Sequence, residues 1–272
     1  HKIQLRLNQI EGSVKYSVHV NSKGWLNWKK DGESAGEDDK TIQAVKVELE
    51  GNAAAQYDIY YRTYCQSYGW LDWAKYGETA GTIGMNKRVE AIEVKLVPKN
   101  GQAPGETFVT YRQKGELSYS VHCQSYGWMS EAAEGATAGT SGQGKRLEAI
   151  KINAKTKYKG AIQYQVHVQS YGWMDWKQNG AMAGTSGKAK RLEAIRIKLT
   201  GEMAEKYNVY YRVHAQSYGW LDWAKNGESA GTSGCSYRME AIQIALRPKG
   251  SGAPAQNYQG VTSAQTQAYI SR

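Results

Sequence analysis

The 272-residue sequence is poor in cysteine, proline and phenylalanine. It contains 3 Cys, 4 Pro and 1 Phe, against 20 Tyr and 9 Trp. An odd number of cysteines without a Cys-x-x-Cys pair excludes a disulfide-dense scaffold and a cysteine-based zinc site. No run of about 18 apolar residues is present, which excludes a transmembrane helix, and the lack of helical spacing excludes a βαβ architecture. No signal segment opens the sequence, so we expect any export signal to lie outside it.

The residues that are abundant are basic or aromatic. Lys and Arg number 35 against 25 Asp and Glu, a formal net charge of +10. This excess favours anionic partners such as a cell-wall polymer or an anionic glycan, and otherwise indicates a solvated face. The basic helix or Arg-rich aromatic sheet of a nucleic-acid reader is absent, so we expect no nucleic-acid partner. Tyr and Trp in place of Phe are typical of surfaces that bind something.

Five copies of one pattern run through most of the sequence. The clearest reads Tyr164-Gln-Val-His-Val-Gln-Ser-Tyr-Gly-Trp173-Met-Asp-Trp176, then Ala183-Gly-Thr-Ser-Gly187, then Arg191-Leu-Glu-Ala-Ile195. We number the repeats 1 to 5 by their first tryptophans, which are Trp25, Trp70, Trp128, Trp173 and Trp220. A second tryptophan follows in four copies, as Trp28, Trp73, Trp176 and Trp223. Tandem copies of about 45 residues indicate a repeat architecture, in which one copy cannot bury its own apolar face.

These motifs resemble the ChW repeats, the clostridial hydrophobic repeats with conserved tryptophan, and the resemblance covers most of the sequence. It implies a protein that is exported by, or displayed on, clostridia and related Gram-positive bacteria. It also implies a binding module, for substrate or for other proteins, whose ligand the family does not define.

Repeats 1 and 3 depart from the pattern. In repeat 1, Ser22-Lys23-Gly24 replaces Ser-Tyr-Gly, Glu37-Asp38-Asp39 replaces Thr-Ser-Gly, and Thr41 and Gln43 replace Arg and Glu. Repeat 3 has Ser130 and Glu131 where other copies have Asp and the second tryptophan. A site built from these positions is therefore expected to be incomplete in these two copies.

The prolines indicate a second level of organisation. All four lie in two similar tails, residues 98–104 and 248–254, which follow repeats 2 and 5. The second tail closes a block of three repeats, whereas only two full repeats precede the first. Residues 3–7 resemble the last strand of a repeat, so we expect the sequence to start within a repeat, as a fragment of a longer protein. Two domains follow, residues 1–114 and 115–272.

Alternation of apolar and polar residues predicts strands at both ends of each repeat. In the last strand of repeat 4, Ile195, Ile197 and Leu199 are expected to point inward, and by the same parity so are Arg191 and Glu193. Three such repeats are expected to close around an axis. The predicted fold is all-β, with two domains of pseudo-threefold repeats that are β-prism-like; a β-trefoil is the alternative.

Polar residues that recur once per repeat are assigned to structure rather than to catalysis. The motif histidines are His19, His122, His167 and His214, with Tyr64 in repeat 2. Single histidines on separate strands do not converge as metal ligands must. The motif glutamates are Glu90, Glu148, Glu193 and Glu240, each two residues after an arginine. An Arg–Glu pair at a sheet end explains them better than the paired carboxylates of a glycosidase. We therefore expect no enzyme, no catalytic residue, no metal and no cofactor.

The two classes of tryptophan separate a packing role from a binding role. The first tryptophan occurs in all five copies and is expected to be a buried, structural anchor. The second is replaced by Glu131 in repeat 3, and a position that accepts Glu lies near solvent. We expect ligand contacts from the second tryptophans, their neighbouring aspartates and the tyrosines of Ser-Tyr-Gly: Trp28, Trp73, Trp176, Trp223, Asp72, Asp175, Asp222, Tyr126, Tyr171 and Tyr218. The alternative is that the second tryptophan only covers the edge of the core.

The cysteines are expected to be free thiols. Cys65 and Cys123 precede the same Gln-Ser-Tyr-Gly-Trp in different domains, where a small buried strand residue fits, and Cys235 is the third.

The leading functional hypothesis is a non-enzymatic, extracellular or cell-surface module that binds a host protein or glycoprotein, such as an immunoglobulin. The alternative is a lectin-like module for cell-wall or mucin glycans, and a third possibility is a spacer without a ligand. Glycan sites are expected to recur as equivalent pockets, whereas a protein epitope needs only one non-equivalent face. Membrane insertion is not expected.

Overall fold

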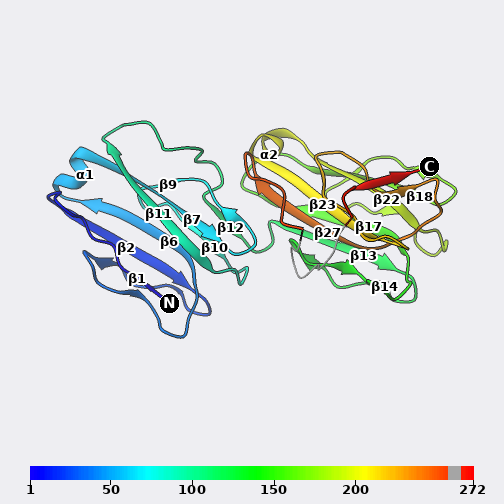
Figure 1. The fold of residues 1–272 in the computed structure, drawn as a ribbon, viewed down its shortest axis with the longest axis horizontal. Helices are drawn as coiled ribbons and strands as arrows, with labels where there is room; N and C mark the ends of the chain where they lie inside the picture. The colour runs from blue at the N-terminus through cyan, green and yellow to red at the C-terminus, as the bar shows by residue number, and fades with distance from the viewer. Residues whose placement is uncertain (257–264) are drawn as a thin grey trace. The chain divides into compact units, whose positions relative to one another are not determined.

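The structure, a computed structural model, describes residues 1–256 and 265–272 and is nearly all β (Figure 1). The all-β prediction is confirmed. The described chain forms two compact units, which we call unit 1 (His1–Lys114) and unit 2 (Gly115–Arg272). The two described helices, α1 (Asn52–Gln56) and α2 (Gly201–Lys206), are short links that follow the last strands of repeats 1 and 4.

Each repeat is built on a long antiparallel hairpin. The first strands are β2 (Ser13–Val20), β7 (Tyr57–Cys65), β13 (Leu117–Cys123), β18 (Ile162–Val168) and β23 (Tyr207–Ala215). The last strands are β6 (Ile42–Glu50), β11 (Val89–Pro98), β17 (Leu147–Ala154), β22 (Leu192–Leu199) and β27 (Met239–Pro248). Within each repeat the first strand pairs with the last along its whole length.

Two short strands in each repeat fold back on the first strand. The Gly-Trp strands are β3 (Gly24–Trp25), β8 (Gly69–Trp70), β14 (Gly127–Trp128), β19 (Gly172–Trp173) and β24 (Gly219–Trp220). The strands after the second tryptophan position are β4 (Lys29–Lys30), β9 (Ala74–Lys75), β15 (Ala132–Ala133), β20 (Lys177–Gln178) and β25 (Ala224–Lys225). The Ser-Tyr-Gly sequence makes the reversal possible, because both Ser170 and Gly172 have positive φ values, 68° and 69°.

The fourth strand of each repeat leaves its own hairpin and pairs with a strand outside that repeat. These Ala-Gly strands are β5 (Ala35–Gly36), β10 (Ala80–Ile83), β16 (Ala138–Gly139), β21 (Ala183–Gly184) and β26 (Ala230–Ser233). In unit 2, β21 pairs with β17, β26 with β22 and β16 with β27, so the three repeats are joined in a cycle. In unit 1, β10 pairs with β6, and β5 pairs with the short β1 (Lys2–Ile3), which takes the place of a last strand.

The glycine of the Ala-Gly strand permits this crossing. Gly184 has a φ of +102°, and a Cβ atom built there would lie 2.4 Å from the carbonyl oxygen of Glu148. Only glycine brings the two backbones so close.

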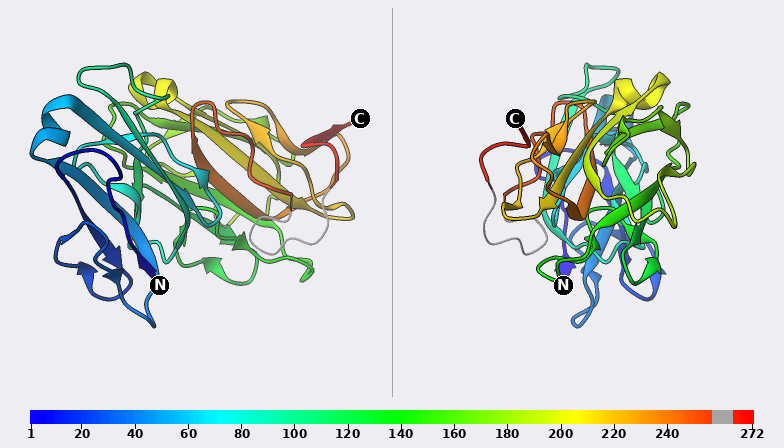
Figure 2. Two further views of the ribbon diagram at one scale, coloured as in Figure 1. Left: turned by 60° about the vertical axis from the view of Figure 1, so that its left-hand side comes forward. Right: turned by 90° about the vertical axis from the view of Figure 1, so that its right-hand side faces the viewer.

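Each unit ends in a tail that returns to its last repeat. The tails form β12 (Tyr111–Gln113) and β28 (Tyr269–Ser271), which pair in parallel with β10 and β26 respectively. Figure 2 shows β28 as the short red arrow that leads to the C-terminus.

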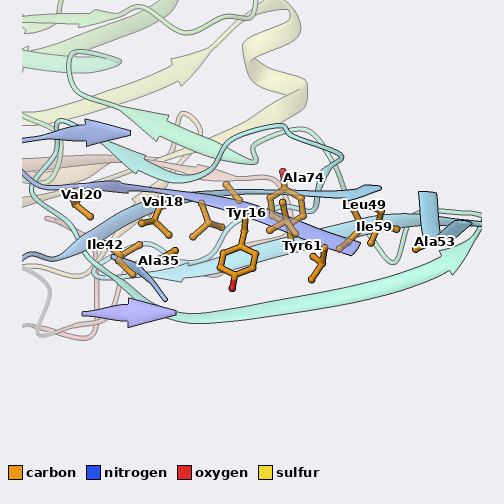
Figure 3. Close-up of a cluster of buried hydrophobic side chains, with 14 residues drawn as sticks. Tyr16, Val18, Val20, Ala35, Ile42, Leu49, Ala53, Ile59, Tyr61 and Ala74 are labelled. Carbon is orange, nitrogen blue, oxygen red and sulfur yellow. The ribbon is translucent and has the colours of Figure 1, made fainter. Parts of the chain in front are cut away.

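The core explains part of the preference for tyrosine over phenylalanine. Tyr16 and Tyr61 are buried among aliphatic side chains such as Val18 and Leu49 (Figure 3). Their hydroxyl groups donate hydrogen bonds to main-chain carbonyl groups, as do those of the equivalent tyrosines: Tyr16, Tyr61, Tyr119, Tyr164 and Tyr211. Tyrosine therefore supplies apolar bulk and also holds a loop carbonyl inside the repeat.

The predicted inward orientation of the motif glutamates is wrong, because a β-bulge interrupts the last strand of each repeat. His167 pairs with Ala194 and Val168 with Leu192, which leaves Glu193 without a residue opposite it on the neighbouring strand. The extra residue reverses the parity, so Glu193 does not share the face of Ile195 and instead reaches the imidazole of His167, 3.0 Å away. The same register shift occurs in every repeat.

All three cysteines are free, as predicted, with Cys65 and Cys123 buried. Burial raises the pKa of the Cys65 thiol to about 12, so this thiol is unreactive near neutral pH. The choice between a β-prism and a β-trefoil stays a prediction.

Candidate functional site

The first tryptophan belongs to a recurring polar group on the hairpin surface. In repeat 4, the imidazole of His167 meets the ring of Trp173 edge-on, with centroids 5.5 Å apart. Arg191 pairs with Glu193 across 2.8 Å, and Glu193 also faces the His167 Nδ1 atom. Repeats 3 and 5 contain the same group, whereas repeat 1 has Gln43 in place of Glu and repeat 2 has Tyr64 in place of His. The predicted Arg–Glu pairs are therefore present, and they hold the histidine that orients the indole.

A cation covers the first tryptophan in each repeat. The group is Lys46 in repeat 1, Arg62 in repeat 2, Lys151 in repeat 3, Arg196 in repeat 4 and Arg212 in repeat 5. The closest contact is that of Arg196, whose guanidinium carbon lies 4.1 Å from the Trp173 ring centroid. Such stacking stabilises an indole at the surface without burying it.

The expected burial of the first tryptophan is wrong. Trp70 and Trp128 are exposed, and Trp25, Trp173 and Trp220 are only partly buried. The reason is the short Gly-Trp strand, which pairs at the outer edge of its hairpin, opposite the histidine, rather than over the core. A structural role for these residues stays a prediction, and it would operate through the histidine and the cation.

The second tryptophan divides into two environments. Trp28 and Trp176 are 41% and 38% exposed, in agreement with the expected position near solvent. Trp73 and Trp223 are only 3% and 8% exposed, contrary to that expectation. Since the motif is the same, the difference in exposure comes from the segment of chain that covers the indole.

The tails cover the second tryptophan in repeats 2 and 5. In repeat 2, the amides of Asp72 and Trp73 donate to the carbonyls of Val109 and Glu106, at 3.0 and 2.8 Å. In repeat 5, the amide of Asp222 donates to the carbonyl of Gln267 at 3.0 Å. The two buried indoles therefore pack beneath a segment of their own chain.

The tyrosines of Ser-Tyr-Gly, which are expected to contact a ligand, are likewise exposed in the open repeats and more buried in the covered ones. Tyr126 and Tyr171 are 55% and 51% exposed, whereas Tyr218 is partly buried. Tyr68, the equivalent in repeat 2, is buried, and the Arg112 guanidinium of the tail stacks on its ring at 5.4 Å.

The expected aspartates are also in two environments. Burial raises the pKa of the Asp72 carboxyl, although its hydrogen bond from the Val109 amide opposes the shift. Asp222 accepts hydrogen bonds from the Trp223 amide and the Gln256 side chain. Asp175 is exposed.

Repeat 4 thus exposes three of the expected contact residues: Tyr171, Asp175 and Trp176. The Lys198 ammonium lies 4.3 Å from the Trp176 ring centroid, and that of Lys188 lies 5.7 Å from the Tyr171 ring centroid. We call these three residues, with Lys188 and Lys198, the repeat 4 patch. It combines aromatic area with positive charge and suits a binding surface.

Sequence reasoning missed the cations that stack on the tryptophans and the tail cover. The signal for the cations was present, since Arg62 and Arg212 lie two residues before the motif Tyr64 and His214. Both pack against the two tryptophans of their own repeat.

Within residues 1–256 and 265–272, no cluster of three or more His, Cys, Asp or Glu side chains is placed to hold a metal ion. The same residues contain no helix that is long and apolar enough to cross a membrane.

The fold and the surface define an all-β protein of tandem repeats that presents aromatic and cationic side chains. The family model "Clostridial hydrophobic W" (ChW) matches residues 19–51, 64–98, 122–155, 167–201 and 214–248. The chain therefore belongs to the ChW family, as the motifs predicted. No curated protein and no solved structure matches the chain.

Proposed function

We propose that the chain is a non-enzymatic, extracellular binding module of a Gram-positive surface or secreted protein, and that it binds a host protein or glycoprotein such as an immunoglobulin. The family supports a repeat-containing, surface-associated binding module, and ChW repeats are not typically enzymatic. The repeat 4 patch provides the contact area, because exposed Trp and Tyr side chains are typical of protein interfaces.

The uneven exposure of the second tryptophan carries this proposal. Equivalent glycan sites would present the same pocket in several repeats, yet the indole is open in repeats 1 and 4, covered in repeats 2 and 5 and absent from repeat 3. Repeat 1 also has Lys23 in place of the tyrosine and Asn27 in place of the aspartate. A single non-equivalent face favours a protein epitope over a repeated sugar.

Glycan binding is the second candidate because one observation favours it. Trp176 is exposed and Asp175 precedes it in the sequence, a combination that can stack on a sugar ring and accept its hydroxyl hydrogen bonds. The partner would then be a mucin or cell-wall glycan.

The test measures binding of the full chain to immobilised immunoglobulin and to mucin, each before and after enzymatic deglycosylation. Binding that survives deglycosylation and weakens at least 10-fold in Trp176→Ala supports the proposal. Tyr76→Ala removes an exposed aromatic side chain outside the patch and serves as the matched control, with binding unchanged. Binding that disappears on deglycosylation supports the glycan candidate instead, and equal affinity of Trp176→Ala and the parent overturns the role of the patch.

A further inference from the structure

We propose that repeat 4 binds an extended peptide segment of its partner, which adds as a parallel strand along the free edge of β21, as the tails add to β10 and β26. This inference rests on the proposed function, because it names the chemical form of the partner at the repeat 4 patch. Strand addition of this kind takes affinity from main-chain hydrogen bonds and specificity from alternate side chains.

The two tails bind their repeats in one register. Tyr111 lies opposite Gly81 in unit 1, and Tyr269 lies opposite Gly231 in unit 2. The glycine amide donates to the carbonyl of the residue before the tyrosine, at 3.1 Å for Gly81 and 2.9 Å for Gly231. Three residues after the tyrosine, the amide of a basic residue, Lys114 or Arg272, donates to the last carbonyl of the Ala-Gly strand. Two unlike sequences therefore share a Tyr-x-x-basic pattern on the same surface.

The tails also make main-chain contacts beside the second tryptophan. The amide of Asp72 donates to the carbonyl of Val109, and the Val109 amide returns a bond of 2.8 Å to the Asp72 carboxylate. In unit 2, the Asp222 amide donates to Gln267 in the equivalent position. The aspartate thus engages main-chain atoms that any extended peptide presents.

Repeat 4 offers the same groups, and no part of the chain that the structure describes adds to it as a tail. Among the residues that the structure describes, β21 pairs only with β17, so it is an edge strand. The Thr185 amide donates to Glu148 in β17, and bonds in an antiparallel ladder use alternate residues, so the amide and carbonyl of Gly184 face the free edge. Within the described chain, Asp175 makes no hydrogen bond or ion pair, and its carboxylate is available to a peptide amide.

The threonine of the Ala-Gly-Thr sequence gives an independent indication. In the covered repeats, the hydroxyl groups of Thr82 and Thr232 donate to the carbonyls of Lys87 and Tyr237. The equivalent hydroxyl of Thr185 is buried and, among the described residues, has no hydrogen-bond partner. A buried hydroxyl without a hydrogen-bond partner is unfavourable. A strand added on this edge could move the following loop toward Thr185, so that a loop carbonyl accepts its hydrogen bond as in the covered repeats.

The tails also indicate which peptide fits. Arg112 stacks on Tyr68, and Tyr171 is the exposed equivalent in repeat 4. The Tyr269 hydroxyl lies 2.5 Å from that of Ser233, which corresponds to Ser186. In a segment that reads Tyr-Arg-x-basic, the tyrosine would therefore contact Ser186 and the arginine would stack on Tyr171. Residues 105–114 carry this pattern and make a suitable probe.

The experiment titrates the full chain into a fluorescein-labelled, end-capped peptide with the sequence of residues 105–114 and follows anisotropy. We expect saturable binding that weakens at least 10-fold in Trp176→Ala and in Asp175→Ala, both of which should fold because the side chains are exposed. Trp28→Ala, an exposed tryptophan in repeat 1, should change affinity less than twofold. A peptide of scrambled order should not bind. Hydrogen exchange should show new protection at the Gly184 amide.

Absence of saturable binding, or binding that is unchanged in both repeat 4 variants, would overturn the inference. Protection of the Ala-Gly strand in another repeat in place of Gly184 would overturn it as well. If immunoglobulin or mucin binds through Trp176 while the peptide does not, the peptide mode fails and the proposed function stands. If the peptide binds as expected but neither glycoprotein does, the named partner fails and the peptide mode stands.

Discussion

Repeats 4 and 5 have nearly the same sequence around their tryptophans, yet their second tryptophans are in opposite environments. Trp176 is exposed and Trp223 is buried, because a tail returns to repeat 5, whereas no described segment returns to repeat 4. A residue in a repeat protein therefore takes its environment from the segment that lies on it as much as from its motif. The same motif serves as core in one copy and as surface in another.

The largest expected effect tests this contrast in stability. Trp223→Ala removes a buried indole and should lower the free energy of unfolding of unit 2 by about 3 to 5 kcal/mol. Trp176→Ala removes an exposed indole of the same unit and should cost about 1 kcal/mol or less. Calorimetry of the full chain measures both. Equal losses would mean that the tail does not bury Trp223 in solution.

A second comparison uses the last strands that end each unit. All ten residues of β27 are buried, whereas none of β11 is, because β16 pairs with β27 and, among the described residues, only β7 pairs with β11. Leu246→Ala in β27 should cost about 2 to 5 kcal/mol. The equivalent Leu96→Ala in β11 should cost about half as much or less, since Leu96 is only partly buried. Denaturant unfolding, with hydrogen exchange to assign each transition to its unit, gives both values. A larger loss in Leu96→Ala would contradict the observed packing.

A third prediction concerns the cycle of unit 2. A Cβ atom at Gly139 would lie 2.4 Å from the carbonyl oxygen of Glu240, so Gly139→Ala should cost about 2 to 3 kcal/mol by separating β16 from β27. Gly142 also has a positive φ, but nothing lies within 4 Å of its Cβ position. Gly142→Ala should therefore cost only about 1 kcal/mol. Thermal unfolding compares the two, and equal shifts would show that the strand exchange contributes little.

The smallest expected effect is a dependence of the stability of unit 2 on pH. Burial lowers the pKa of His214 below its ordinary value of 6.5, against the opposing effect of Glu240. The unfolded chain then binds a proton at higher pH than the folded chain. The contribution of neutral His214 to the stability of the fold is therefore fully present above pH 6.5 and is lost as the pH falls toward the lowered pKa. The melting temperature of unit 2 should fall over this window. His214→Tyr, which copies Tyr64 of repeat 2, should reduce the slope, and identical slopes would contradict the assignment.

The sequence was sufficient for features that depend on local pattern. Alternation predicted the all-β fold, and the position of Cys65 before Gln-Ser-Tyr-Gly-Trp predicted a buried free thiol. The spacing of Arg191 and Glu193 predicted their ion pair.

Features that depend on distant segments could not be read from the motif. The bulge at Glu193 reversed the expected parity, because pairing with β18 requires one extra residue there. The cover over Trp73 comes from Glu106 and Val109, which lie outside the repeat and carry no sign of their target. The exposure of the first tryptophan follows from edge pairing, which a repeated aromatic residue does not reveal.

The open edge of repeat 4 is tested most directly by amide hydrogen exchange in the free full chain at Gly184 and Gly231. The two glycines hold the same place in their repeats, but among the described residues only the Gly231 amide donates to a tail carbonyl, that of Ala268. We expect slow exchange at Gly231 and exchange at least 100-fold faster at Gly184. Equal protection of the two amides would contradict this expectation, because repeat 4 would then have no open edge to offer a partner.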